Sequence, residues 1–131
     1  MTVVEHDREW YQTLSSLLPE DVTLLLREPT RSGHMTSEAA PGSYFDDYVQ
    51  TIADTADDSL DLVIIDGRAR MACARASTTK VRRGGTLLLD DSDRPWNAGL
   101  SVDLSEWHRT DIRGLKPGGG VHQTTMWRRP A

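Results

Sequence analysis

Short apolar runs that alternate with helical patterns limit the fold more than any other feature of this sequence. The continuous runs "VTLLL" (22–26) and "LDLVII" (60–65) have the length and composition of strands that are buried on both faces. "TLLL" (86–89) follows the same pattern, and "TVV" (2–4) is β-branched. Stretches with apolar residues at helical spacing separate these runs. The alternation predicts an α/β fold: a Rossmann-like, mostly parallel sheet with helices on both faces.

Three of the intervening stretches predict helices. Asp7 is expected to cap the first, because its carboxylate can accept hydrogen bonds from the free amides of the first turn, and Pro19 ends it. Ser43 is expected to cap the second helix. The third is rich in alanine and arginine and is expected to run to about Val81, before a turn at 84–85. The apolar positions of the first two helices are Trp10, Leu14, Leu17, Leu18, Phe45, Tyr48, Val49 and Ile52.

The end of the chain departs from this alternation. The segment 95–106 has no clear pattern, and a short helix is one interpretation of it. "WHRTDIRG" (107–114) and "VHQTTMWRR" (121–129) are typical of strands, and the joint "LKPGGG" between them is too short for a crossover helix. These two strands are therefore expected to pair as an antiparallel hairpin.

Composition narrows the class of protein. A chain of 131 residues is expected to form a single domain (1–131), and its 37% hydrophobic content is enough for one core. No apolar run approaches the ~20 residues that span a bilayer, and the N-terminus has no signal-peptide pattern. The single cysteine, Cys73, excludes an intramolecular disulfide, so a cytoplasmic setting is expected. The net charge of −5 argues against nucleic-acid binding.

Acidic residues stand at the ends of the predicted strands, where ligands bind in open α/β sheets. They are Glu5, Asp66 and the pair Asp90-Asp91. Neighbouring strands lie about 4.8 Å apart, so carboxylates on adjacent strand ends would converge and repel. A divalent cation, an arginine or a shared proton would relieve that repulsion, and the sequence leaves all three open. The arginines close enough in sequence are Arg68 and Arg94.

Five blocks of the sequence, in order, resemble class I S-adenosylmethionine-dependent methyltransferases. The likeness is greatest to a bacterial subgroup with an "EHD-x-x-W" block, a "VDGRAR" block and a "GGxLxLDDSxR" block. The blocks in this chain are "VVEHDREWY", "YFDDYVQTIA", "LDLVIIDGRARMACA", "RRGGTLLLDDSDRP" and "TTMWRR".

The resemblance implies a cofactor site and a catalytic site. Glu5 would bind the ribose hydroxyls of S-adenosylmethionine, and His6, Asp66 and Gly67 are the further cofactor-binding candidates. Asp66 would lie near the transferring methyl group, which makes Asp66 and Asp90 the catalytic candidates. The most favoured function is therefore methyl transfer from S-adenosylmethionine to a small acceptor, with oxygen as the expected acceptor atom.

A magnesium site is a further implication of the resemblance. The catechol O-methyltransferase-like branch keeps a metal aspartate at the position of Asp66 and an Asp-Asn metal pair at the position of Asp90 and Asp91. Magnesium there would lower the pKa of a substrate hydroxyl. This chain has Asp-Asp instead, and "DGRAR" follows Asp66 in place of that branch's usual continuation.

The resemblance also implies an N-terminally truncated, partial domain. In this family the strand that ends in Glu5 is the second, and a first strand, a glycine-rich loop and a helix precede it. The implied sheet order is 3-2-1-4-5-7-6, so the absent strand is central. Its absence leaves two strand edges open. These edges could close on one another, or a partner or a second copy of the chain could cover them. Gly118 to Gly120 cannot replace the loop, because no helix follows them.

Two other functions remain as alternatives. One is a non-catalytic remnant of the methyltransferase fold. The other is a phosphoacceptor receiver domain with metal-binding acids at Glu5 and Asp7 and an aspartate at Asp66. Against it, the interval from Asp7 to Asp66 is too long, Asp90-Asp91 stand where Ser or Thr belongs, and a strand-like segment replaces the last helix. The expected partner is a small-molecule substrate, and neither nucleic acid nor a membrane is expected.

Overall fold

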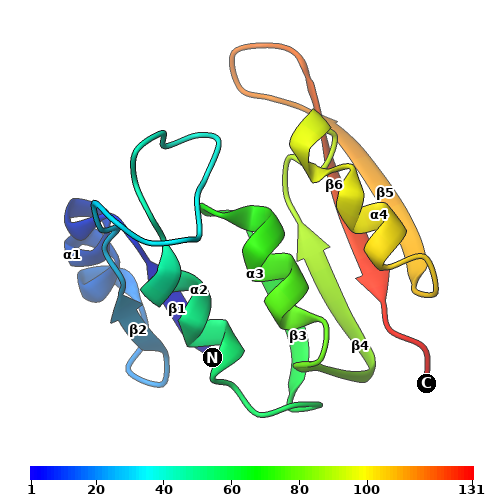
Figure 1. Ribbon diagram of the computed structural model, residues 1–131, viewed down its shortest axis with the longest axis horizontal. Helices are drawn as coiled ribbons and strands as arrows, with labels where there is room; N and C mark the ends of the chain where they lie inside the picture. The colour runs from blue at the N-terminus through cyan, green and yellow to red at the C-terminus, as the bar shows by residue number, and fades with distance from the viewer. The chain divides into compact units, whose positions relative to one another are not determined.

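The computed structural model describes residues 1–131 and shows an α/β chain that divides into two compact units (Figure 1). The N-terminal unit comprises residues 1–51 and 67–69, and the C-terminal unit comprises residues 52–66 and 70–131. The prediction of a single domain over 1–131 stays a prediction. No helix of the chain is long and apolar enough to span a membrane.

The N-terminal unit is built on two parallel strands. β1 (Thr2–Glu5) pairs with β2 (Thr23–Leu26) from Thr2 opposite Thr23 to Glu5 opposite Leu26. α1 (Arg8–Leu17) connects them. The predicted cap is confirmed, since an Asp7 carboxylate oxygen accepts from the Trp10 amide at 2.9 Å.

The second helix begins later than the sequence predicts. α2 (Asp46–Ala53) starts at Asp46, so the prediction that Ser43 caps it was wrong. The Asp46 carboxylate accepts instead from the amides of His34 and Met35, at 3.0 and 3.1 Å, which ties the preceding loop to the first turn of α2. Phe45, at 2% exposure, anchors the start of the helix in the core.

The C-terminal unit contains a four-stranded sheet in the order β3-β4-β6-β5. β3 and β4 are parallel, whereas β6 runs antiparallel to both β4 and β5. The predicted hairpin is therefore confirmed, and its last strand stands where a receiver domain would place its last helix. The strands are β3 (Leu60–Ile65), β4 (Val81–Leu89), β5 (His108–Leu115) and β6 (Val121–Arg128).

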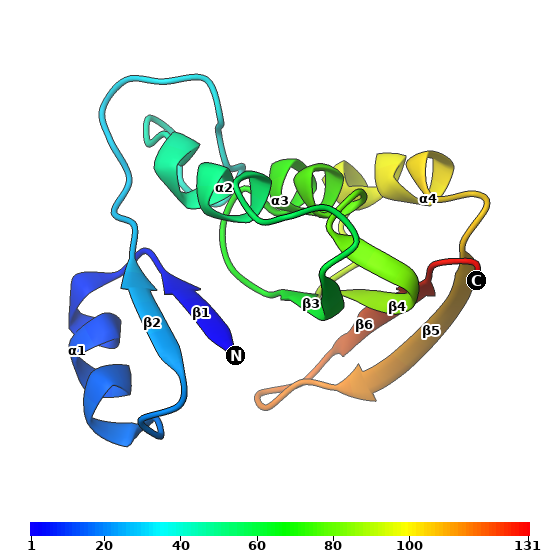
Figure 2. The ribbon, with the colours of Figure 1, turned by 90° about the horizontal axis from the view of Figure 1, so that it is seen from below.

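The helices of this unit cover one face of the sheet (Figure 2). They are α3 (Arg70–Ser77), the 3-10 turn η1 (Pro95–Asn97) and α4 (Gly99–Asp103). Alternate residues of the strands point toward them. The core includes Val63, Ile65, Leu87, Leu89, Leu100, Leu104 and Trp127, each at most 9% exposed.

The boundary between the third helix and the strand after it differs from the prediction. α3 ends at Ser77, and Val81 begins β4 instead of ending the helix. The expected turn at 84–85 is a bulge inside that strand, with Gly84 at a φ of 71°. Gly85 has no room for a side chain, because a Cβ there would lie 2.9 Å from the Arg82 carbonyl oxygen. The glycines thus bend the strand without ending it.

Candidate active site

Two of the predicted acids meet at the carboxyl end of the C-terminal unit's sheet. Asp66 follows β3 and Asp90 follows β4, and the last residues of these strands, Ile65 and Leu89, are paired. The Asp66 and Asp90 carboxyls lie close enough for each to shift the pKa of the other. The structure therefore brings together the two residues that the sequence predicts as catalytic.

Other side chains fix this carboxylate pair. Thr124, on β6, donates its hydroxyl to an Asp90 carboxylate oxygen at 2.7 Å. Arg70 lies in the first turn of α3. One of its guanidinium nitrogens donates a hydrogen bond to the Asp90 backbone oxygen, and another donates to an Asp66 carboxylate oxygen at 3.2 Å. The Arg70 side chain is only 16% exposed, whereas that of Asp66 is 65% exposed. Asp66 is thus the member of the pair that solvent and a substrate can reach.

The two carboxyls have opposite pKa shifts. Partial burial, together with the charge of Asp90, raises the pKa of Asp66. Burial acts against the charged form of Asp90 as well, but hydrogen bonds from Thr124, Asp66 and the Asp91 amide outweigh it and lower the pKa of Asp90. Asp66 is therefore the member of the pair that binds a proton more readily.

Asp91 faces a different set of partners. Its carboxylate accepts from the Lys116 ammonium at 2.8 Å and from Arg94 at 2.5 and 3.1 Å. These cations lower the pKa of Asp91 to about 2. Asn97 donates to the Asp91 backbone oxygen at 3.0 Å, and the Asp91 backbone has a φ of 49°. Asp91 is therefore the centre of a structural ion-pair cluster.

The three aspartates predicted as metal ligands, Asp66, Asp90 and Asp91, do not form a site that fits a magnesium ion. Across the chain, no three His, Cys, Asp or Glu side chains are grouped so that they could hold a metal. Asp91 is neutralised by two cations, and Arg70 pairs with the Asp66 carboxylate and has a nitrogen 3.9 Å from Asp91. Protein cations thus already offset the negative charge of this site, so no step through a metal follows from this arrangement.

The predicted ribose-binding acid lies in the N-terminal unit, at the carboxyl end of β1. One carboxylate oxygen of Glu5 accepts from the amides of His6 and Asp7, at 2.7 and 2.8 Å, and lies 2.9 Å from the His6 ring nitrogen Nδ1. The Glu5 side chain is 14% exposed, and its other oxygen has no partner in the chain. A largely buried carboxylate with one oxygen held and one free fits an acceptor for a ligand hydroxyl.

An aromatic cluster surrounds His6. Its ring lies edge-on to Phe45 and Tyr48, with ring centres 5.9 and 6.1 Å apart. Within the same unit, the Tyr48 hydroxyl packs against Gly67, where an added Cβ would lie 2.2 Å from it. Gly67 is thus needed for close packing with Tyr48.

Sequence reasoning missed three side chains of the acidic site. Arg70 stands four residues after Asp66, a helical spacing that could have indicated it. Thr124 faces Asp90 because Leu89 pairs with its neighbour Thr125, which only the register shows. Lys116 follows the last residue of β5 and reaches Asp91 across the sheet, and nothing local in the sequence indicates it.

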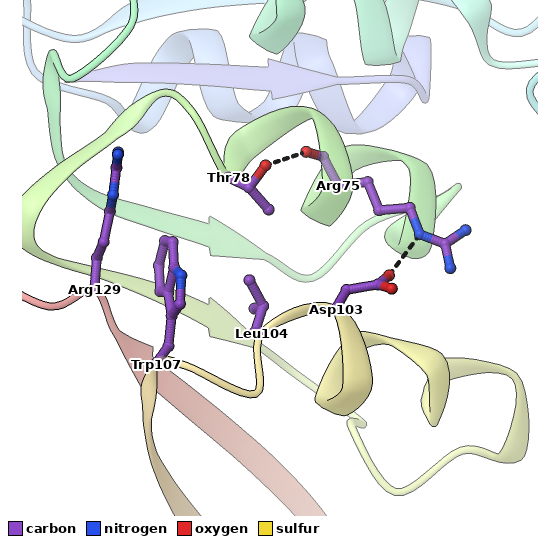
Figure 3. A pocket seen from close by; sticks show the side chains of 6 residues that line it. All are labelled: Arg75, Thr78, Asp103, Leu104, Trp107 and Arg129. Carbon is purple, nitrogen blue, oxygen red and sulfur yellow. Dashed lines mark hydrogen bonds and ion pairs between the residues drawn. The ribbon is translucent and has the colours of Figure 1, made fainter.

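A hollow in the C-terminal unit lies elsewhere, at the end of the sheet where β4 begins and β6 ends (Figure 3). Its volume is about 400 Å³. Its charged side chains are already paired, Arg75 with Asp103 and Arg129 with Asp58, both at 2.7 Å. The hollow is therefore a less suitable reaction site than the strand ends. Its lining residues are Arg75, Thr78, Asp103, Leu104, Trp107 and Arg129.

Comparison with solved structures identifies the fold. A methyltransferase-like protein from Silicibacter pomeroyi is 24% identical, with a TM-score of 0.59 over 99% of this chain and 68% of that one. An O-methyltransferase from Bacillus cereus, solved with S-adenosylhomocysteine, is 12% identical, with a TM-score of 0.70 over 98% of this chain and 61% of that one. The O-methyltransferase TomG from Streptomyces achromogenes, which is involved in tomaymycin synthesis and was solved with S-adenosylmethionine, is 13% identical. Its TM-score is 0.59 over 99% of this chain and 61% of that one. No protein-family model and no curated protein matches the chain.

This chain has the class I methyltransferase fold. The strand orders agree with the order that the resemblance to methyltransferases implies, 3-2-1-4-5-7-6. β2 and β1 correspond to strands 3 and 2, and β3, β4, β6 and β5 correspond to strands 4, 5, 7 and 6. The first strand of the methyltransferase order has no counterpart among residues 1–131.

Proposed function

We propose that the chain functions in methyl transfer from S-adenosylmethionine to an oxygen atom of a small acceptor. The observation that carries the proposal is the Asp66 and Asp90 pair, which is held at the carboxyl ends of adjacent parallel strands with one member open to solvent. The solved structures most relevant to it are O-methyltransferases, two of them with cofactor or product bound.

Asp66 is proposed as the general base. An acceptor hydroxyl must lose its proton as its oxygen attacks the methyl group, and an exposed carboxylate can take that proton. A raised pKa makes a carboxylate a better base near neutral pH. Asp90 and Arg70 act through Asp66, because their hydrogen bonds fix its position.

The cofactor would supply an electrophilic methyl group bound to a positively charged sulfur. On this chain, the free oxygen of Glu5 is proposed to accept from the ribose, with His6 holding the other oxygen in place. Gly67, next to Asp66 in sequence, lets Tyr48 pack closely beside it. Magnesium is not part of the proposal, because protein cations already neutralise Asp91.

Transfer of a labelled methyl group tests the proposal. The full chain would be incubated with S-adenosylmethionine labelled in its methyl group and a panel of small phenols, catechols and hydroxy acids. Removal of a general base typically costs about 10²–10⁴ in rate, so Asp66→Asn should lose at least about a hundredfold. Asp103→Asn, in the hollow at the other end of the sheet, is the matched control and should keep the wild-type rate. Equal rates in wild type and Asp66→Asn would refute the role of Asp66.

A second candidate is a methyltransferase fold without catalysis. The one run of three glycines, Gly118 to Gly120, forms the turn between β5 and β6 instead of a loop before a helix. A folded chain that binds no S-adenosylhomocysteine would support this alternative.

A further inference from the structure

A chain of side-chain hydrogen bonds runs beside the turn that follows Asp90 and has no part in the chemistry proposed above. At its centre is Thr125, on β6, which is fully buried. The Thr125 hydroxyl lies 2.7 Å from the Ser92 hydroxyl and 2.7 Å from a carboxylate oxygen of Asp111 on β5. Valine has nearly the same shape as threonine and no group that must be hydrogen-bonded, so packing alone does not require a hydroxyl at this position.

Counting the protons gives the chain a direction. The hydrogen bond from Thr125 lowers the pKa of Asp111, so this carboxylate is ionised at neutral pH and can only accept. Thr125 therefore gives its one proton to Asp111, and Ser92 must donate to Thr125. The Gln123 amide nitrogen donates to both hydroxyls, at 3.4 and 3.3 Å, and Arg109 donates to the same Asp111 oxygen at 2.9 Å. A chain in one direction that ends on a charge strengthens each of its bonds.

The chain ends at the turn that carries Asp90. The Ser92 amide donates to the Gln123 carbonyl oxygen at 2.8 Å, which ties the turn to β6. Thr124, which points to the other face of β6, donates to the Asp90 carboxylate at 2.7 Å. Between Asp90 and Ser92, Asp91 has a φ of 49°, and a residue other than glycine keeps such a conformation only where its surroundings hold it. β6 therefore holds this turn from both of its faces.

We propose that Thr125 and Asp111 are positioning residues for Asp90, which act through Ser92 by fixing the turn after β4. The effect on catalysis rests on the proposed function, in which Asp90 acts through Asp66. Neither Thr125 nor Asp111 touches the reacting atoms. A displacement of about 1 Å can cost about a hundredfold in rate, so a loosened turn should lower turnover and leave the affinity for the acceptor unchanged.

Thr125→Val removes the hydroxyl at the centre of the chain and keeps the shape of the side chain. Each former partner retains another hydrogen bond in this variant. Ser92 can donate to the Gln123 carbonyl oxygen, which lies at 3.1 Å, and Asp111 keeps its bond from Arg109. The variant is therefore expected to fold, and circular dichroism would confirm it. Thr125→Ser restores the hydroxyl and is the conservative variant.

Carbon-13 magnetic resonance of the full chain, labelled at its aspartate carboxyl carbons and held at pH 7, reports on the surroundings of Asp90 without any turnover. Asp90→Asn identifies the signal. This signal should shift in Thr125→Val and return toward its wild-type position in Thr125→Ser. Gly85→Ala, in the bulge of β4, is the matched control, because it lowers stability without touching the chain and should leave the Asp90 signal in place. An unmoved Asp90 signal in Thr125→Val, or an equal shift in Gly85→Ala, would overturn the proposal.

The methyl-transfer assay tests the effect on catalysis. For Thr125→Val, kcat should fall at least tenfold with an unchanged KM for the acceptor, and Thr125→Ser should recover most of the loss. Gly85→Ala, assayed below its melting temperature, should turn over like wild type. Equal kcat in wild type and Thr125→Val, or an equal loss in Gly85→Ala, would overturn the role in catalysis. A wild-type chain that transfers no methyl group would refute the proposed function, whereas the carboxyl signals still decide whether Thr125 positions Asp90.

Discussion

Replacement of Asp91 by asparagine removes the charge at the centre of the ion-pair cluster while keeping the shape of the side chain. The wild-type carboxylate is buried, with Lys116 at 2.8 Å and Arg94 at 2.5 Å, and its pKa falls from 3.8 to about 2. At about 1.4 kcal/mol for each pKa unit, the ionised carboxylate stabilises the fold by about 2 kcal/mol at neutral pH. Asp91→Asn should lose about this much free energy of unfolding.

The sign of the pH dependence follows from the lowered pKa. The unfolded carboxyl binds a proton more readily than the folded one, so the stabilisation is complete well above pH 3.8 and is lost as the pH falls through about 2. The difference between wild type and Asp91→Asn should therefore shrink from about 2 kcal/mol at pH 7 to about 1 kcal/mol at pH 3.

Urea unfolding followed by circular dichroism measures this difference at both pH values. Asp93→Asn is the matched control, since Asp93 is an exposed carboxylate of the same loop. If Asp91→Asn were as stable as Asp93→Asn at pH 7, or if its deficit did not shrink at pH 3, the assignment of Asp91 to a structural ion-pair cluster would be refuted.

Three further predictions concern the cap, the bulge and the thiol. Asp7→Ala should lower the free energy of unfolding by about 1 kcal/mol through loss of the α1 cap, as measured by urea unfolding, and Asp7→Asn should restore most of it. Gly85→Ala should lower the melting temperature, because its Cβ would lie 2.9–3.0 Å from the Arg82 and Asp61 carbonyl oxygens; an unchanged melting temperature would contradict this packing. Burial raises the pKa of Cys73 to about 12, so a thiol reagent at pH 8 should modify it only after unfolding; rapid modification of the folded protein would contradict the burial.

The sequence indicates most of the strands because apolar composition is a local property. "LDLVII" and the final hairpin were predicted close to their observed bounds, and the Asp7 cap was correct. β4 was divided wrongly because glycines at 84–85 are typical of turns, whereas a bulge is decided by the neighbouring strand. Ser43 was expected to cap α2, but the tertiary contacts of Asp46 with the loop before it set the start of the helix.

The candidate site was predictable in part for the same reason. Acids at the ends of adjacent parallel strands must converge, so Asp66 and Asp90 could be placed together from the sequence. Their partners depend on strand register and on the return of the hairpin, which bring in Thr124 and Lys116. The sequence left open whether a cation, an arginine or a proton relieves the repulsion. The structure shows an arginine, Arg70, paired with Asp66.

Isothermal titration of the full chain with S-adenosylhomocysteine, with and without magnesium, tests the central claim most directly. The proposed function predicts a dissociation constant in the micromolar range, roughly −8 kcal/mol, that does not change with magnesium. Glu5→Ala should weaken binding at least tenfold, whereas Glu28→Ala, which removes an exposed ion pair with Arg8 in the same unit, should not. No heat of binding up to millimolar ligand, from a folded sample, would contradict the account and favour a methyltransferase fold without a cofactor.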